Sequence, residues 1–329
     1  MLQTFLATLN PMLMLFICIA IGFVLRKTHI LPENAGSVMA KLVTWVFAPA
    51  LSFITLAKNC TVDTLATHAA NILLSACGLV VAMTVGIALS FWFVREKSPD
   101  RGVYQYGLVF ANNGYIGDPV IQSLFGDVML SYYKLFTLPM NLVIYTWGIS
   151  VLVPDGAEKK SVLKKLCNAP TIGTLAGVVA GLTGLGAILP DFLTNTLNTL
   201  KGCMGPTAML VAGFTVAGYS IKDMLKDKKV YLATALRLVI LPALIVSVIF
   251  GLKELANHLF SLNIGNTVLF LAFVAYAAPL GLNSVVFPEA YGGNPKTGAG
   301  MALISHTLFV ITMPLLFAVM YALFSAPVI

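Results

Sequence analysis

Ten long apolar runs account for most of this 329-residue chain and decide what it can fold into. Each run holds about 20 largely apolar residues, the length that an α-helix needs to cross the hydrocarbon core of a bilayer. The composition agrees, because 58% of the residues are hydrophobic and 10% are charged, whereas about 25% are charged in soluble domains. We therefore expect an all-α integral membrane protein. The ten predicted spans are 6–25, 36–57, 68–94, 103–125, 129–153, 170–189, 203–220, 230–252, 266–288 and 299–325.

The basic residues indicate how these spans are oriented. The net charge of +7 is typical of a membrane protein with basic cytoplasmic loops and does not indicate nucleic-acid binding. Fifteen Lys and Arg residues belong to the loops after odd-numbered spans, and four belong to the loops after even-numbered spans. The positive-inside rule then predicts a multi-pass protein of the cell membrane with both termini outside. The four residues on the sparse side are Lys58, Lys134, Lys201 and Lys253.

The two halves of the chain resemble each other. The fourth span is interrupted by residues 112–119 (NNGYIGDP) and the ninth by residues 278–284 (APLGLNS). Five helices per half is an odd number, so the second half must enter the membrane from the opposite side, as an inverted repeat. We expect a first repeat over 1–153, a cytoplasmic linker over 154–169 and a second repeat over 170–329.

The two interruptions are the strongest pointer to a functional site. Asn, Gly and Pro are poor helix formers in mid-span, and Pro also removes a backbone hydrogen bond. Unwound backbone at membrane depth is tolerated only where it is buried in protein or lines a cavity. Such a pair at equivalent places in two inverted repeats is typical of a transporter's binding site. A simple proline kink fits less well, because the helix breakers coincide with side-chain amides that need partners.

These segments resemble a known family. Residues 112–121, and Ala278-Pro279 running on to Phe287 and Tyr291, resemble the crossover segments of the auxin efflux carrier family. Lys41-Leu42-Val43 leading to Pro49 resembles that family's second helix. The resemblance covers all ten spans, and its most specific part is Asn112…Gly117-x-Pro119.

This resemblance implies a fold akin to the bile-acid sodium symporters. Helices 1, 2, 6 and 7 would form a scaffold, helices 3–5 and 8–10 a mobile transport domain, and helices 4 and 9 would cross at the substrate site. The short segment 154–169 makes the chain similar to prokaryotic members, which resemble permeases for malate, malonate and other small carboxylates. The family also implies pairing as a homodimer through the scaffold, although no motif in the chain demands it.

A crossing of two broken helices suits an anion. Each half-helix N-terminus carries unpaired N–H groups and roughly +0.5 of a charge. Asn112 is the first candidate for a direct substrate contact, because the family motif places an Asn there and an amide can donate to a carboxylate. It is also expected to cap a free helix end. Further candidates for substrate binding are Asn113, Asn283 and Ser284, and the residues expected to shape the breaks are Gly114, Gly117, Pro119, Pro279 and Gly281.

Asp118 departs from the family pattern, in which an apolar residue usually precedes this proline. An ionisable group at membrane depth is a functional hypothesis by default, so Asp118 is a candidate for coupling transport to H⁺ or Na⁺. Two other readings remain open: it faces a water-filled vestibule, or it pairs with Arg237. For Arg237 itself we expect snorkelling to the membrane interface, ahead of a role as counter-ion to Asp118 or the substrate. His306 is expected to be a hydrogen-bonded packing residue rather than part of a proton relay.

Two series of small residues predict close helix packing. They are Gly173…Gly177…Gly181 and Gly78…Ala82…Gly86, and we interpret them as packing seams, with a sliding surface of a moving domain as the alternative. The five Cys are scattered and never in CxxC spacing, so neither a disulfide nor a metal site is predicted. No P-loop, HExxH or GxSxG motif appears, and no cofactor is expected beyond a coupling ion.

The leading hypothesis is a secondary transporter of a small organic anion, such as a mono- or dicarboxylate or an auxin-like acid, working by alternating access. A cation/proton antiporter of similar architecture is the alternative within transport, but it should place paired acidic residues beside the crossing, and this chain offers Asp118 alone. An intramembrane enzyme would need two catalytic groups at membrane depth. A receptor would need a loop large enough to dock a partner, and none is present.

Overall fold

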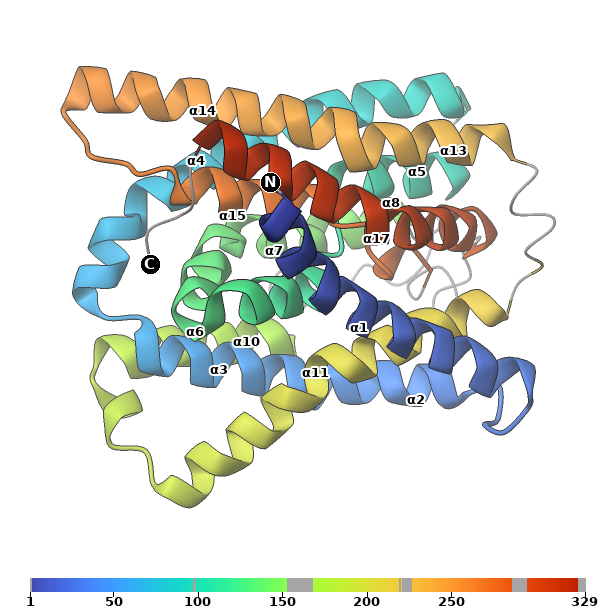
Figure 1. Ribbon diagram of the computed structural model, residues 1–329, viewed down its shortest axis with the longest axis horizontal. Coiled ribbons are helices and arrows are strands. Elements are labelled where there is room, and N and C mark those ends of the chain that lie inside the picture. The colour runs from blue at the N-terminus through green and yellow to red at the C-terminus, as the bar shows by residue number, and fades with distance from the viewer. Residues whose placement is uncertain are drawn as a thin grey trace.

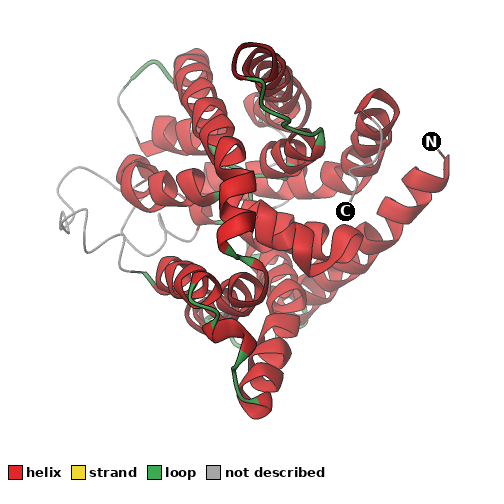
Figure 2. Cartoon of the chain, turned by 90° about the vertical axis from the view of Figure 1, so that its left-hand side faces the viewer, coloured by secondary structure: helices red, strands yellow, loops and turns green. Residues whose placement is uncertain are grey.

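The computed structural model describes residues 2–96, 99–152, 168–218, 220, 227–285 and 295–324. Within these residues every regular element is a helix (Figure 2), and one isolated antiparallel bridge joins Ala111 to Leu280. The expected all-α class is therefore confirmed for this part of the chain. Residues 154–167 of the predicted linker, together with Phe287 and Tyr291, lie outside the described residues.

The first half contains two long helices, α1 and α4, and several shorter, jointed ones (Figure 1). They are α1 (Leu2–Lys27), α2 (Ala35–Leu42), η1 (Val43–Phe47), α3 (Ala48–Asn59), α4 (Val62–Phe93), α5 (Pro99–Val109), η2 (Asn113–Gly117), α6 (Asp118–Phe136), α7 (Leu138–Val143), η3 (Ile144–Gly148) and α8 (Ile149–Leu152).

The second half alternates long helices with short ones. Its described elements are α10 (Ala169–Leu182), η4 (Leu185–Ala187), α11 (Asp191–Ala217), α13 (Lys228–Ala235), η5 (Leu236–Ile240), α14 (Leu241–Phe260), α15 (Thr267–Ala277) and α17 (Pro295–Phe324).

Length and apolar character mark this as a multi-pass membrane protein. Five described helical stretches are long and apolar enough to cross a membrane, and a sixth is obtained when a bent pair is counted as one span. The predicted count of ten spans, the inverted repeat and the division into scaffold and transport domain stay predictions. The five stretches are Ala35–Asn59, Val62–Phe93, Asp191–Ala217, Lys228–Phe260 and Lys296–Phe324.

Three of these helices widen into a π-helical turn just before a proline. The turns η1, η2 and η5 end two residues before Pro49, Pro119 and Pro242. In each, an N–H bonds the carbonyl five residues back, as Ala48 N–H does to Val43. A proline lacks its own N–H, and its ring clashes with the carbonyl four residues earlier. The wide turn relieves that clash without ending the helix.

The predicted glycine seam joins α10 to α3 with their backbones in contact. A methyl group built at Gly173 would lie 2.6 Å from Pro49 Cα, and one at Gly177 would lie 2.8 Å from the Phe53 carbonyl oxygen. Figure 1 shows the two helices side by side along one edge of the molecule. Because the family resemblance assigns both helices to the scaffold, a sliding role for this seam does not fit the predicted domain division.

The helix at the centre of the molecule is α15. All ten residues from Val268 to Ala277 are buried, and a helix that is apolar on every side belongs in a core. Its last turn leads directly into the second predicted interruption, so the packing of α15 fixes where that interruption lies.

Candidate functional site

The two predicted interruptions are broken and lie against each other. Helix α5 ends at Val109 and η2 begins at Asn113, while α15 ends at Ala277 and the chain becomes helical again at 283. Between these ends Ala111 bridges to Leu280, and the Asn112 N–H donates to the Pro279 carbonyl at 2.8 Å. Each segment therefore meets part of the other's hydrogen-bonding need, as buried backbone requires.

The first break is shorter and earlier than predicted. We expected it over 112–119, but the non-helical residues are 110–112, and the chain is helical from Asn113 onward. The reason is local: Asn112 starts the helix as its N-cap, and the π-helical turn η2 accommodates Pro119 inside that helix. The second break, 278–282, begins where it was predicted and ends before Asn283.

Asn112 combines a cap with an unused donor. Its Oδ1 accepts a hydrogen bond from the Tyr115 N–H at 3.3 Å, which caps η2. Its side chain is buried, and Nδ2 has no hydrogen-bond partner among the described residues. A buried amide N–H normally has a partner, so this atom is available to a ligand.

The other three amide and hydroxyl candidates already have protein partners. Asn113 Nδ2 donates to Asn141 Oδ1 at 3.3 Å, and Asn283 Nδ2 donates to the Tyr106 hydroxyl at 3.1 Å. The Ser284 hydroxyl donates to the Gly281 carbonyl at 2.7 Å. These contacts hold the crossing together, and Asn112 is the candidate whose donor remains free.

The residues expected to shape the breaks differ in how tightly they are packed. A methyl group at Gly117 would overlap the Tyr133 hydroxyl, and one at Gly281 would lie 3.3 Å from a ring carbon of Tyr106. At Gly114 a methyl group would meet nothing within 4 Å. Close packing therefore explains Gly117 and Gly281, while Gly114 borders open space at the start of η2. The carbonyl of Pro279 serves the crossing by accepting from Asn112, as described above.

Asp118 is buried and pairs with Lys134. Sixteen residues of straight helix would rise about 24 Å, so the pair can form only because the chain reverses between them. The reversal is at Gly126, whose φ of 77° lies in the left-handed region that glycine tolerates. The suggested Asp118–Arg237 pair is not formed.

The expectation that Arg237 snorkels to the membrane interface is wrong. Its side chain is completely buried, and one guanidinium nitrogen donates to the Ala278 carbonyl at 3.3 Å, at the second break. Nε and the other terminal nitrogen have no partner among the described residues. The prediction failed because it placed Arg237 near a helix end, whereas η5 and α14 continue its helix to Phe260.

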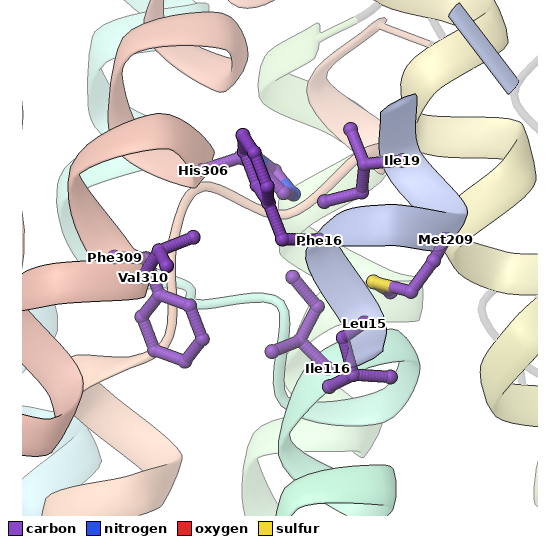
Figure 3. Close-up of a pocket in the computed structure, with 8 residues that line it drawn as sticks. All are labelled: Leu15, Phe16, Ile19, Ile116, Met209, His306, Phe309 and Val310. Carbon is purple, nitrogen blue, oxygen red and sulfur yellow. The ribbon is translucent and has the colours of Figure 1, made fainter. Parts of the chain in front are cut away.

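His306 is hydrogen-bonded and packed, as expected. Its Nδ1 lies 2.7 Å from the Ala302 carbonyl oxygen, and the ring borders a small pocket (Figure 3). The pocket lies among α1, α11, η2 and α17, and its lining is apolar apart from His306. The lining residues are Leu15, Phe16, Ile19, Ile116, Met209, His306, Phe309 and Val310.

Sequence reasoning missed the buried lysines. Lys134, Lys201 and Lys253 were counted as loop charges, but each is at most 6% exposed. A signal was present for Lys134, which falls inside the predicted span 129–153. The ion pairs are Lys134–Asp118, Lys201–Asp127 and Lys253–Glu254.

Comparison with known proteins places this site in a transporter family. Residues 7–317 match the family model described as membrane transport protein. The chain is 24% identical over 244 residues to an uncharacterized transporter of Methanothermobacter thermautotrophicus, covering 72% of this chain and 77% of that protein. It is 21% identical over 218 residues to an uncharacterized transporter of Methanocaldococcus jannaschii, covering 65% of this chain and 70% of that protein. The match over nearly the whole chain confirms the family resemblance found in the sequence, and the protein belongs to the membrane transport protein family that includes the auxin efflux carriers.

Proposed function

We propose that this transporter carries a small organic anion, such as a mono- or dicarboxylate or an auxin-like acid, by secondary active transport. The anion would bind where the breaks at 110–112 and 278–282 meet. The transport step would be an elevator-type movement of the elements α4–α8 and α13–α17 against α1–α3, α10 and α11, which changes the side of the membrane to which the site opens.

The observation that carries this proposal is the free donor at the crossing. Asn112 begins the helix formed by η2 and α6, and its Nδ2 is buried without a partner among the described residues. A helix N-terminus attracts negative charge, and an amide N–H donates to a carboxylate. Both features favour an anion over a cation at this position.

A small pocket lies at the boundary of the predicted domains. The pocket in Figure 3 has α1 and α11 on one side and η2 and α17 on the other. The family resemblance assigns the first pair to the scaffold and the second to the transport domain. Ile116 in its lining and the open position at Gly114 both belong to η2, so this boundary runs beside the proposed anion site.

The coupling ion is proposed to act at Asp118. Its buried carboxylate is held by the Lys134 ammonium, and a buried ion pair is sensitive to any cation that competes for the carboxylate. A proton or Na⁺ at Asp118 would release Lys134. That release would change the contact between the parts of α6 before and after Gly126. Transport would then depend on the gradient of that cation.

An uptake assay tests the proposal. The purified protein is reconstituted into proteoliposomes and given labelled malate, malonate, lactate or indole-3-acetate under imposed pH, Na⁺ and voltage gradients. We expect saturable uptake of at least one acid that depends on one of these gradients. Uptake of none of the four above protein-free liposomes would contradict the proposed function.

The two alternatives have less support. A cation/proton antiporter of similar architecture should place a second acid beside Asp118, but its neighbour is Lys134, and Asp118 is the one buried acidic side chain among the described residues. An intramembrane enzyme is disfavoured by the family, whose description is transport. We further propose the cell membrane as location, with both termini outside, and a homodimer formed through the scaffold, as the charge asymmetry and the family resemblance imply.

A further inference from the structure

We infer that Arg237 supplies the positive charge that neutralises one carboxylate group of the transported anion. This inference rests on the proposed function and makes it more specific. It assigns to the site a residue in α13–η5–α14, outside both broken segments, and it predicts that the protein distinguishes a carboxylate from an uncharged amide of the same shape.

The first argument is the balance of buried charge. Five charged side chains are buried among the described residues. Four of them form an ion pair with a side chain of opposite charge. Arg237 is completely buried and has no acidic partner there. An isolated buried charge is costly unless it is paired, so a negative partner from outside the chain would stabilise this arrangement. The paired residues are Asp118, Lys134, Lys201 and Lys253.

The second argument is that several buried polar atoms that have no partner among the described residues belong to the second break and to the segments that contact it. Of eight buried side-chain polar atoms without a partner in the described residues, five belong to four residues near the second break and its partner helix. Two are guanidinium nitrogens of Arg237, and one is the hydroxyl of Tyr276, which lies two residues before the second break. Thr234 lies one turn before Arg237 on the same helix, and Asn112 supplies the fifth atom.

The third argument is the position of the guanidinium relative to the crossing. Arg237 donates to the carbonyl of Ala278, and the backbone of Asn112 donates to the carbonyl of the next residue, Pro279. The guanidinium of Arg237 and the backbone of Asn112 are therefore held by consecutive residues of one break. An anion bound there would interact with both the guanidinium and the N-terminus of η2.

A purely structural role for Arg237 explains less. The hydrogen bond to Ala278 satisfies a carbonyl beyond the end of α15, and a cation is favourable at a helix C-terminus. That role uses one of the five N–H donors of a guanidinium and leaves Nε and one terminal nitrogen without partners. The N–H groups of these two nitrogens can each donate a charge-assisted hydrogen bond to a carboxylate oxygen.

The test compares each acid with its amide. Wild type, Arg237→Gln and Arg237→Lys are reconstituted, and the acid taken up best among malate, malonate, lactate and indole-3-acetate is labelled. Unlabelled acid and the corresponding amide then compete for uptake. In wild type we expect the acid to compete at least ~30-fold better than the amide. In Arg237→Gln this ratio should fall to within about threefold, and Arg237→Lys should retain an intermediate ratio. Gln at 237 removes the charge and retains an N–H donor, and thermal unfolding of each variant checks that the protein folds.

The outcomes separate the two proposals. If wild type takes up none of the four acids, the proposed function fails. If wild type transports an acid but Arg237→Gln keeps the acid-to-amide ratio of wild type, the role of Arg237 is overturned and the proposed function stands. If acid and amide both compete less well in Arg237→Gln, by the same factor, the proposed role of Arg237 is also overturned, because that result indicates a structural role. Should Arg237→Gln be too inactive for competition, protection from thermal unfolding by the same acid and amide gives the ratio without transport.

Discussion

The seam between α3 and α10 and the crossing of the two breaks are both places where backbones touch, but they are built in opposite ways. At the seam, Gly173 and Gly177 bring two unbroken helical stretches together with no room for a methyl group. At the crossing, both helices are interrupted and the backbones pair at Ala111 and Leu280. Buried donors on Asn112 and Arg237 have no partner there among the residues that the structure describes.

This difference separates packing from binding. In a membrane, small residues let helices gain dispersion energy by close approach, and a position that excludes even a methyl group has no space for a ligand. Free polar atoms in a buried region are costly and rare, so their retention at the crossing favours a ligand as the missing partner. Substitutions at the seam should therefore change folding, and substitutions at the crossing should change transport.

The largest effect is expected at the seam. Gly177→Leu places four heavy atoms against the Phe53 carbonyl and Leu56, more than the few methylenes whose insertion costs ~1–3 kcal/mol in a packed core. We expect no folded protein by size-exclusion chromatography in detergent. Gly202→Leu is the control, because Gly202 is exposed and has nothing within 4 Å. A folded Gly177→Leu variant with wild-type thermal stability would show that α3 and α10 do not pack backbone to backbone.

The next largest effect is expected at the buried ion pair between Asp118 and Lys134. Asp118→Asn leaves Lys134 buried without its partner, and breaking a buried pair costs ~3–5 kcal/mol. Thermal unfolding should show this loss, and the double variant Asp118→Asn/Lys134→Met should recover most of it, because neither position then carries a buried charge.

The same variants test ion coupling. If the coupling proposal is correct, both should lose uptake driven by the gradient that drives wild type, even where stability has recovered. Asp118→Asn protein whose uptake is still fully driven by that gradient would remove Asp118 from the coupling mechanism.

At the crossing itself we expect a large effect on transport with a small one on stability. Asn112→Ala loses both the cap and the free amide, and Asn112→Ser keeps a capping oxygen while losing the amide. Loss of a cap costs ~1 kcal/mol, so only the Ala variant should unfold at a lower temperature. Uptake should fall about tenfold or more in both, corresponding to ~1.4 kcal/mol of binding free energy. Wild-type uptake by Asn112→Ser would mean that the free amide does not contact the substrate.

The position of the crossing could be predicted from the sequence, but the partners of its charged side chains could not. The clusters at 112–119 and 278–284 combine helix breakers with amides, a local pattern that survives in the structure with its first boundary shifted. Asp118 with Lys134, and Arg237 with Ala278, depend on a chain reversal at Gly126 and on the packing of α14 against α15. Those contacts join residues far apart in the sequence, and spacing alone could not distinguish a buried lysine or arginine from one at a helix end.

The smallest effect is expected at a hydrogen bond that links the seam, through η1, to the crossing, through η2. Thr44 in η1, which continues into α3, shares a hydrogen bond with the Tyr115 hydroxyl in η2 at 3.0 Å. Tyr115→Phe removes that bond, worth ~0.5–1.5 kcal/mol, and Thr44→Val removes it from the other side. A double-mutant cycle on thermal stability should give a coupling energy of that size.

The kinetic consequence of that bond decides whether the two regions move relative to each other. If η2 moves past η1 during transport, the bond exists in one state of the cycle, and losing it shifts the balance of states by ~2- to 10-fold. The maximal uptake rate would then change in both single variants while the acid-to-amide ratio stays at the wild-type value. An unchanged rate alongside the measured coupling energy would mean that the bond persists throughout the cycle, so η1 and η2 would travel together and the boundary of the moving domain would lie elsewhere.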